Sequence, residues 1–72
     1  MYEVGDKVII RKDLVNTQYY GSNDVASRMM KYRGRVATIV DVLNTFPSKE
    51  YLIDLDNQHF AWTPEMFEKG ND

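Results

Sequence analysis

The sequence predicts a small domain of the mainly β class, built as a very small barrel. The first observation is a run rich in β-branched residues at 34–43, which begins with a glycine and reads GRVATIVDVL. The second is a shorter run at 51–55, in which large apolar side chains recur at every second position, as they do in a half-buried strand. Because only a short connection separates the two runs, we expect them to pair as a bent hairpin.

The composition sets the size of the core. The chain has 72 residues, of which 43% are hydrophobic and 28% charged, which is typical of a globular domain rather than a disordered segment. A domain of this size buries roughly 60% of the surface of its unfolded chain, so its core is thin. We expect residues 1–72 to form one domain, with a monomer as the default oligomeric state.

The absence of cysteine excludes disulfides and thiolate zinc sites. The first residues lack the basic and apolar regions of a signal peptide, and no apolar run approaches the roughly 20 residues of a membrane span. We therefore expect a cytoplasmic protein that does not contact a membrane.

The first part of the chain contains one clear strand. Residues 4–7 are expected to form a turn that leads into a strand over 8–11, because a glycine is followed by β-branched residues. Within that strand, Val8 and Ile10 should point inward.

Residues 12–33 show no strand pattern, yet so long a loop without structure is unusual in a small domain. A short helix over 24–31 is expected to order it. Polar residues at 22–24 can cap the free amides, and apolar residues then recur four positions apart.

In the strand over 34–43, apolar side chains stand at both odd-numbered and even-numbered positions, so both faces of the strand are apolar. The strand is therefore expected to bend across two faces of a barrel. The later elements follow in order: a hairpin loop over 44–49, a strand over 51–55, a turn at 56–58, a short strand over 59–62, a 3-10 turn over 63–67 and an extended piece at 68–69. Proline at the first position of the 3-10 turn favours it, and Phe67 is expected to fill the bottom of the core.

This order of about five strands, with a short helix in the long first loop and a 3-10 turn near the C-terminus, resembles that of an SH3-like barrel. Four segments resemble small uncharacterised proteins encoded by phages and prophages of Gram-positive bacteria: VGDKV (4–8), MKYRGRVATI (30–39), YLIDLDN (51–57) and WTPEMF (62–67). The resemblance implies an SH3-like fold in a bacterial or phage cytoplasmic protein, and it implies no activity. More remotely, Gly34-Arg35-Val36 followed by Ile39 resembles the glycine-led strand of KOW barrels.

The charges are unevenly distributed along the chain. The formal net charge is −2, with +3 in residues 1–36 and −5 in residues 37–72. Four basic residues gather around Tyr32, namely Arg28, Lys31, Arg33 and Arg35. Cations next to an aromatic ring suit a phosphate backbone with a stacked base, so a nucleic-acid-binding surface is one hypothesis. The alternative is that nearby acids pair with these cations.

Aromatic residues carry the leading hypothesis, which is a non-enzymatic interaction module that binds a protein or peptide partner. SH3-type barrels hold extended or proline-rich peptides between aromatic side chains. The residues expected to form such a surface are Tyr19, Tyr20, Tyr32 and Trp62. The opposing interpretation is that these rings cover the thin core. Among them, Tyr20 is expected to be the most exposed ring, and Trp62 is expected to be buried with its ring N–H bonded to an acceptor.

No pattern in the sequence predicts an enzyme, a cofactor or a metal. Asp54, Asp56 and Glu65 match the acidic positions of a calcium loop, but His59 stands where that loop needs glycine. The aspartates are expected on one face of the strand over 51–55, as exposed carboxylates without a pocket that would make them catalytic. His59 is the only histidine and is expected at the edge of a turn.

Overall fold

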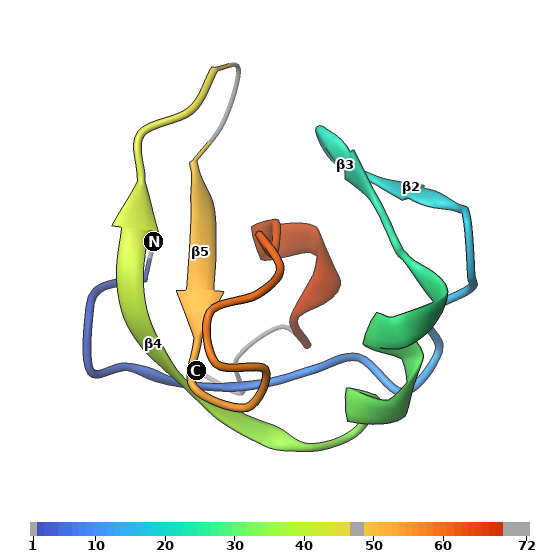
Figure 1. The fold of residues 1–72 in the computed structure, drawn as a ribbon, viewed down its shortest axis with the longest axis horizontal. Helices are drawn as coiled ribbons and strands as arrows, with labels where there is room; N and C mark the ends of the chain where they lie inside the picture. The colour runs from blue at the N-terminus through green and yellow to red at the C-terminus, as the bar shows by residue number, and fades with distance from the viewer. Residues whose placement is uncertain (1, 47–48, 69–72) are drawn as a thin grey trace.

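A three-stranded antiparallel sheet forms the centre of the molecule. The computed structural model describes residues 2–46 and 49–68. The sheet consists of β1 (Lys7–Ile9), β4 (Val36–Leu43) and β5 (Glu50–Ile53), in the order β1-β4-β5 (Figure 1). β1 thus includes Lys7, one residue earlier than expected, and β5 ends at Ile53, two residues earlier. The loop expected over 44–49 includes residues 47 and 48, which lie outside the described residues.

The long strand β4 joins two pairings, as its apolar pattern predicts. Its first half pairs with β1, with Ile9 opposite Val36, and its second half pairs with β5, with Leu43 opposite Glu50. The ladder with β5 is irregular between Ile39 and Asp41, which is where a strand can change direction. The arch of β4 in Figure 1 follows from this division.

A small hairpin that the sequence analysis missed occupies the long first loop. β2 (Tyr19–Tyr20) pairs with β3 (Asn23–Asp24) through a two-residue turn. Gly21 is the first turn residue and has a φ of 70°, a conformation that glycine adopts without steric cost. The pairing extends to Val25, whose N–H donates to the carbonyl of Gln18 at 3.1 Å.

The helix expected over 24–31 is present in a different form, as the 3-10 helix η1 (Ser27–Tyr32). It cannot begin at 24, because Asp24 belongs to β3 and Ala26 is still extended, with a ψ of 151°. Met29 and Tyr32 are its buried residues and lie three positions apart, the spacing that a helix of three residues per turn places on one face. The four-residue spacing used for the prediction was therefore the wrong period.

The last part of the chain returns to the sheet at two points. A turn over 54–58 follows β5, and Trp62 then pairs with Tyr51 as an isolated bridge, so the strand expected over 59–62 is reduced to one pairing. The 3-10 helix η2 (Pro64–Met66) follows as predicted, with proline in its first turn. After it, Phe67 pairs with Ile10. The expected extended piece at 68–69 includes residue 69, which lies outside the described residues.

The core lies between the sheet, the long loop and η2. Val8 and Ile10 are buried as predicted, and Trp62 and Phe67 are buried with them. Trp62 lies near the rings of Tyr32 and Phe67, with centroid distances of 6.2 Å and 6.5 Å. Within the described residues, the protein is a mainly β domain of five strands in two sheets with a 3-10 turn near its C-terminal end.

Candidate functional site

Four basic residues lie on or just after η1, and all of them are exposed. Arg28 and Lys31 belong to η1, and Arg33 and Arg35 lie in the segment between η1 and β4. Arg28 and Lys31 are three positions apart, so the 3-10 geometry stacks them on one face, about 120° around the helix axis from the face of Met29 and Tyr32. The same period that buries the apolar residues of η1 therefore presents its cations to solvent. We call these four residues the basic surface.

The described acids form no salt bridge with the basic surface. Across residues 2–46 and 49–68, the single salt bridge joins Arg11 to Asp13, at 2.8 Å. Lys31 Nζ lies 5.3 Å from the centre of the Tyr32 ring, a cation–π contact that leaves its charge in place. Within the described residues, no internal ion pair occupies a cation of the basic surface, contrary to the alternative interpretation of these charges.

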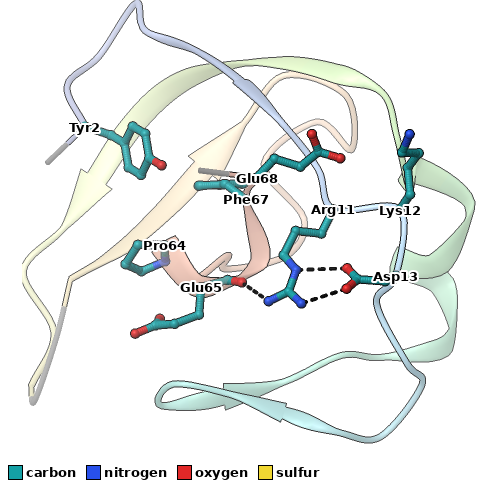
Figure 2. A pocket seen from close by; sticks show the side chains of 8 residues that line it. All are labelled: Tyr2, Arg11, Lys12, Asp13, Pro64, Glu65, Phe67 and Glu68. Atoms are coloured by element: carbon teal, nitrogen blue, oxygen red, sulfur yellow. Dashed lines mark hydrogen bonds and ion pairs between the residues drawn. The ribbon is translucent and has the colours of Figure 1, made fainter. Parts of the chain in front are cut away.

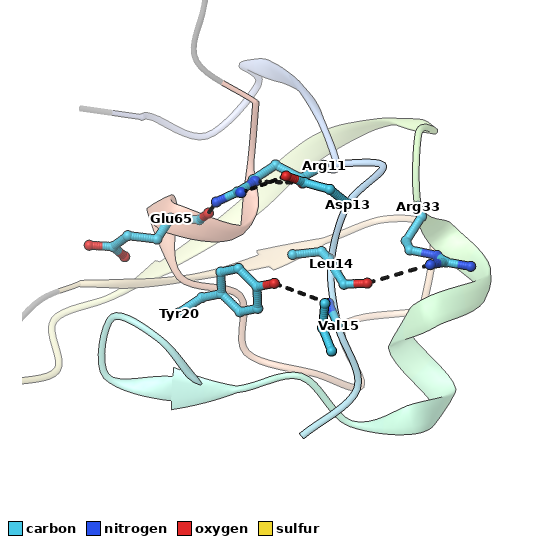
Figure 3. A network of polar contacts seen from close by, with 7 residues as sticks. All are labelled: Arg11, Asp13, Leu14, Val15, Tyr20, Arg33 and Glu65. Carbon is cyan, nitrogen blue, oxygen red and sulfur yellow. Dashed lines mark hydrogen bonds and ion pairs between the residues drawn. The ribbon is translucent and has the colours of Figure 1, made fainter. Parts of the chain in front are cut away.

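Arg33 differs from the other three residues, because its side chain holds the backbone together. Its Nε donates to the carbonyl of Met30 at 3.1 Å. Its Nη1 donates to the carbonyl of Leu14 at 3.4 Å, a bond that Figure 3 draws. These bonds connect the C-terminal end of η1 to the long loop. Arg33 therefore stabilises the fold through these hydrogen bonds and also carries an exposed positive charge.

Arg11 is fixed at the start of the same loop. It donates to both carboxylate oxygens of Asp13, and its Nη1 donates to the carbonyl of Glu65 at 3.1 Å (Figure 3). The hydrogen bonds between Arg11 and Asp13 stabilise both charged groups. They hold the pKa of Asp13 below its ordinary value and raise the pKa of Arg11. Its guanidinium also lies 5.2 Å from the centre of the Tyr20 ring. The guanidinium of Arg11 therefore has a structural role, because it contacts Asp13, the Glu65 carbonyl and the Tyr20 ring.

Lys12 extends the basic surface. A Cβ atom added to Gly34 would lie 3.1 Å from Cγ of Lys12, so this lysine packs beside the turn that carries Arg33 and Arg35. Lys12 is exposed.

The rings expected to bind a partner lie in two different environments. Tyr19 is 70% exposed, whereas Tyr20, Tyr32 and Trp62 are all less than 10% exposed and belong to the core. The expectation that Tyr20 is the most exposed of these rings is wrong. Its phenol oxygen accepts a hydrogen bond from the Val15 N–H at 3.0 Å, which turns the ring inward (Figure 3). Whether any of the four rings binds a partner stays a prediction.

The acidic residues near 54–56 do not lie on a strand face as expected, because β5 ends at Ile53 and both aspartates belong to the turn. Asp54 is exposed, and its Oδ1 accepts from the Thr38 N–H at 3.0 Å. The expectation of an exposed carboxylate is wrong for Asp56, which is only 7% exposed. Its acceptors are used by the N–H groups of Gln58 and Phe60 and by Nε1 of Trp62.

The sequence carries a signal for this role of Asp56, which we did not use. An aspartate in a turn can accept backbone N–H groups two to four positions later, and a buried tryptophan needs an acceptor for its ring N–H.

Among the described residues, no three His, Cys, Asp or Glu side chains are placed to share a metal ion.

Two of the surface clefts, both lined by described residues, bear on the candidate site. The larger has a volume of ≈ 860 Å³ and lies between the N-terminal segment, the start of the long loop and η2 (Figure 2). Its lining combines the rings of Tyr2, Pro64 and Phe67 with the charged side chains of Arg11, Lys12, Asp13, Glu65 and Glu68.

The smaller cleft has a volume of ≈ 320 Å³ and lies between η1 and the turn after β5. Arg28, Lys31 and Tyr32 form its η1 side, and Asp56, Asn57, His59 and Phe60 form the other. It therefore brings two residues of the basic surface next to aromatic rings.

Comparisons with protein-family models, with curated proteins and with solved structures found no match to this chain. Within the part of the chain that the structure describes, every helix is too short or too polar to cross a membrane.

Proposed function

We propose that this chain is a non-enzymatic module that binds nucleic acid through the basic surface. The observation that carries the proposal is the exposure of Arg28, Lys31 and Arg35 without an acidic partner among the described residues. Unpaired cations spaced along a surface attract a phosphate backbone and release its counterions when they bind it. The earlier hypothesis of a partner surface built on four rings has less support, because three of the rings are used by the core.

The net charge of −2 limits the strength of such binding. The acidic C-terminal half repels a polyanion at long range, while the basic surface attracts it at contact. Binding should therefore be strongest at low salt and depend on the few cations of this surface. Asp13 adds little repulsion, because Arg11 compensates its charge.

The proposal also includes the finer architecture, an SH3-like barrel. Two isolated bridges extend the sheet at its two edges. Phe67 pairs with Ile10, which follows β1 at one edge, and Trp62 pairs with Tyr51 of β5 at the other edge. η2 connects these two residues, so the chain itself links the two sides of the sheet. A solution structure in which the segments around Trp62 and Phe67 lie far apart would contradict this closure. An origin in a phage or prophage and a cytoplasmic location stay predictions.

The test compares two double variants that change the net charge equally. Arg28→Gln with Lys31→Gln removes two cations from the basic surface, and Lys7→Gln with Lys49→Gln removes two from outside it. Affinity for a labelled oligonucleotide is measured by fluorescence anisotropy at low salt. We expect the first variant to bind about tenfold more weakly than wild type and the control to stay within about twofold. Equal losses in the two variants, or no binding by wild type, would contradict the proposal.

A second candidate function is binding of an extended peptide in the larger cleft. The observation that favours it is the cluster of Tyr2, Pro64 and Phe67 in a cleft of ≈ 860 Å³. Amide shifts of the residues that line the cleft would move during titration with a proline-rich peptide. Unchanged shifts at millimolar peptide would remove this candidate.

A further inference from the structure

We propose that the smaller cleft holds one unpaired base of the bound strand, and that the protein therefore prefers single-stranded to double-stranded nucleic acid. This inference rests on the proposed function, because it concerns how the same basic surface recognises its ligand. Four observations carry it: the size of the cleft, its rings, its cations and the rigidity of its wall.

The size of the cleft suits one flat ring. At ≈ 320 Å³ it lies at the lower end of the range for small-molecule sites, which is about 300–1,000 Å³. Such a space admits a base that has turned away from its strand. A duplex cannot enter it, because the bases of a duplex are stacked inside and their flat faces are covered.

The rings of the cleft provide surfaces for stacking. His59 and Phe60 lie edge to face with centroids 4.6 Å apart, and His59 is exposed while Phe60 is partly buried. A partly buried ring holds its neighbour in position, and the exposed ring can meet a ligand. Stacking of bases on aromatic side chains tolerates any base, so the cleft need not select a sequence.

The cations stand on the opposite wall from these rings. Arg28 and Lys31 line the cleft from consecutive turns of η1, and Lys31 is held over the ring of Tyr32. A nucleotide carries a flat ring and an anionic phosphate joined by a sugar. The cleft offers both groups, because His59 and Phe60 lie on one wall and Arg28 and Lys31 on the other. The Asp56 carboxylate also lines it, but that carboxylate is buried and accepts three internal hydrogen bonds.

The wall that carries the rings is rigid before any ligand arrives. Asn57 and Gln58 have positive φ angles, of 54° and 61°, and Asp56 fixes this turn by accepting from the N–H groups of Gln58 and Phe60. The same carboxylate accepts from the ring of Trp62 in the core at 3.0 Å. A wall tied to the core in this way binds with little loss of conformational entropy.

The test measures binding of a labelled deoxythymidine oligomer and of a duplex of equal length, by fluorescence anisotropy at one low salt concentration. Wild type should bind the single strand at least about fivefold more tightly than the duplex, which is the low end of one base stacked on a ring. His59→Ala should remove this preference and leave duplex affinity within about twofold. His59→Phe keeps a ring at the position and should retain the preference.

The matched control is Tyr19→Ala, which removes an exposed ring outside the cleft and should leave both affinities unchanged. Equal wild-type affinity for the two ligands, or a preference that survives in His59→Ala, would overturn the inference and leave the proposed function standing. Loss of binding to both ligands in wild type would instead remove the proposed function itself. Unfolding curves of the two alanine variants show whether each is folded during the measurement.

Discussion

At the scale of single residues, the Asp56 carboxylate connects the turn after β5 to the core. It accepts three hydrogen bonds, two from backbone N–H groups and one from the ring of Trp62, which has no exposed surface. A buried donor that loses its acceptor destabilises the folded state, because its lost hydrogen bonds to water are no longer replaced. The position of the cleft wall and the position of the tryptophan therefore depend on the same side chain.

Replacing Asp56 tests this connection. Asp56→Ala should lower the free energy of unfolding by about 2–3 kcal/mol, because Trp62 Nε1 stays buried without an acceptor. Asp56→Asn keeps one oxygen and should cost less. Urea denaturation followed by the fluorescence of Trp62, the only tryptophan, gives both values. The control is Asp54→Ala, at an exposed acceptor in the same turn, and an equal loss there would show that burial of Asp56 has no special importance.

At the scale of elements, η1 determines which side chains reach solvent. Its period of three buries Met29 and Tyr32 and exposes Arg28 and Lys31. A helix in this region could be predicted from the sequence, because polar residues precede an apolar pattern. Its 3-10 form could not, because the residues at 25, 26, 29 and 30 fit a four-residue period equally well. The pairing of β3 with β2 keeps the chain extended up to Ala26, so the helix begins only at Ser27.

Arg33 should stabilise η1, whereas Arg35 should not. Arg33→Ala removes hydrogen bonds to the carbonyls of Met30 and Leu14 and should lower the free energy of unfolding by about 1 kcal/mol. Arg35→Ala removes the same charge two positions later and should stay within about 0.5 kcal/mol of wild type. Parallel urea titrations of the two variants measure the difference. Equal stabilities would mean that the Arg33 bonds do not hold η1 in place.

The β2–β3 hairpin shows why short strands escape sequence analysis. Each of its strands has only two residues, too few for an alternating pattern, and β3 consists of Asn23 and Asp24, residue types that are rare in strands. What fixes the hairpin is tertiary contact: a Cβ at Gly21 would collide with the carboxylate of Glu65, so the turn lies directly against the segment of η2.

At the scale of the whole molecule, the sheet was more predictable than the surface. β1, β4, β5 and η2 carry strong local signals, and the inward positions of Val8, Ile10 and Phe67 follow from the signals of β1 and η2. Tyrosine gives no such signal, because its ring suits the core and its hydroxyl suits the surface, so Tyr19 and Tyr20 could not be distinguished from the sequence. The cluster of basic residues was visible in the sequence, but only the fold shows that its cations form no salt bridge with the described acids.

The central claim is that the basic surface contacts phosphates directly, and the salt dependence of binding tests it most directly. The measurement is the affinity for a labelled single-stranded oligonucleotide from about 20 to 200 mM salt. Three phosphate contacts by Arg28, Lys31 and Arg35 predict a slope of log K against log salt near −2, and Arg28→Gln with Lys31→Gln should reduce its magnitude by about 1.4. Affinity that does not change with salt, or an unchanged slope in that double variant, would contradict the claim.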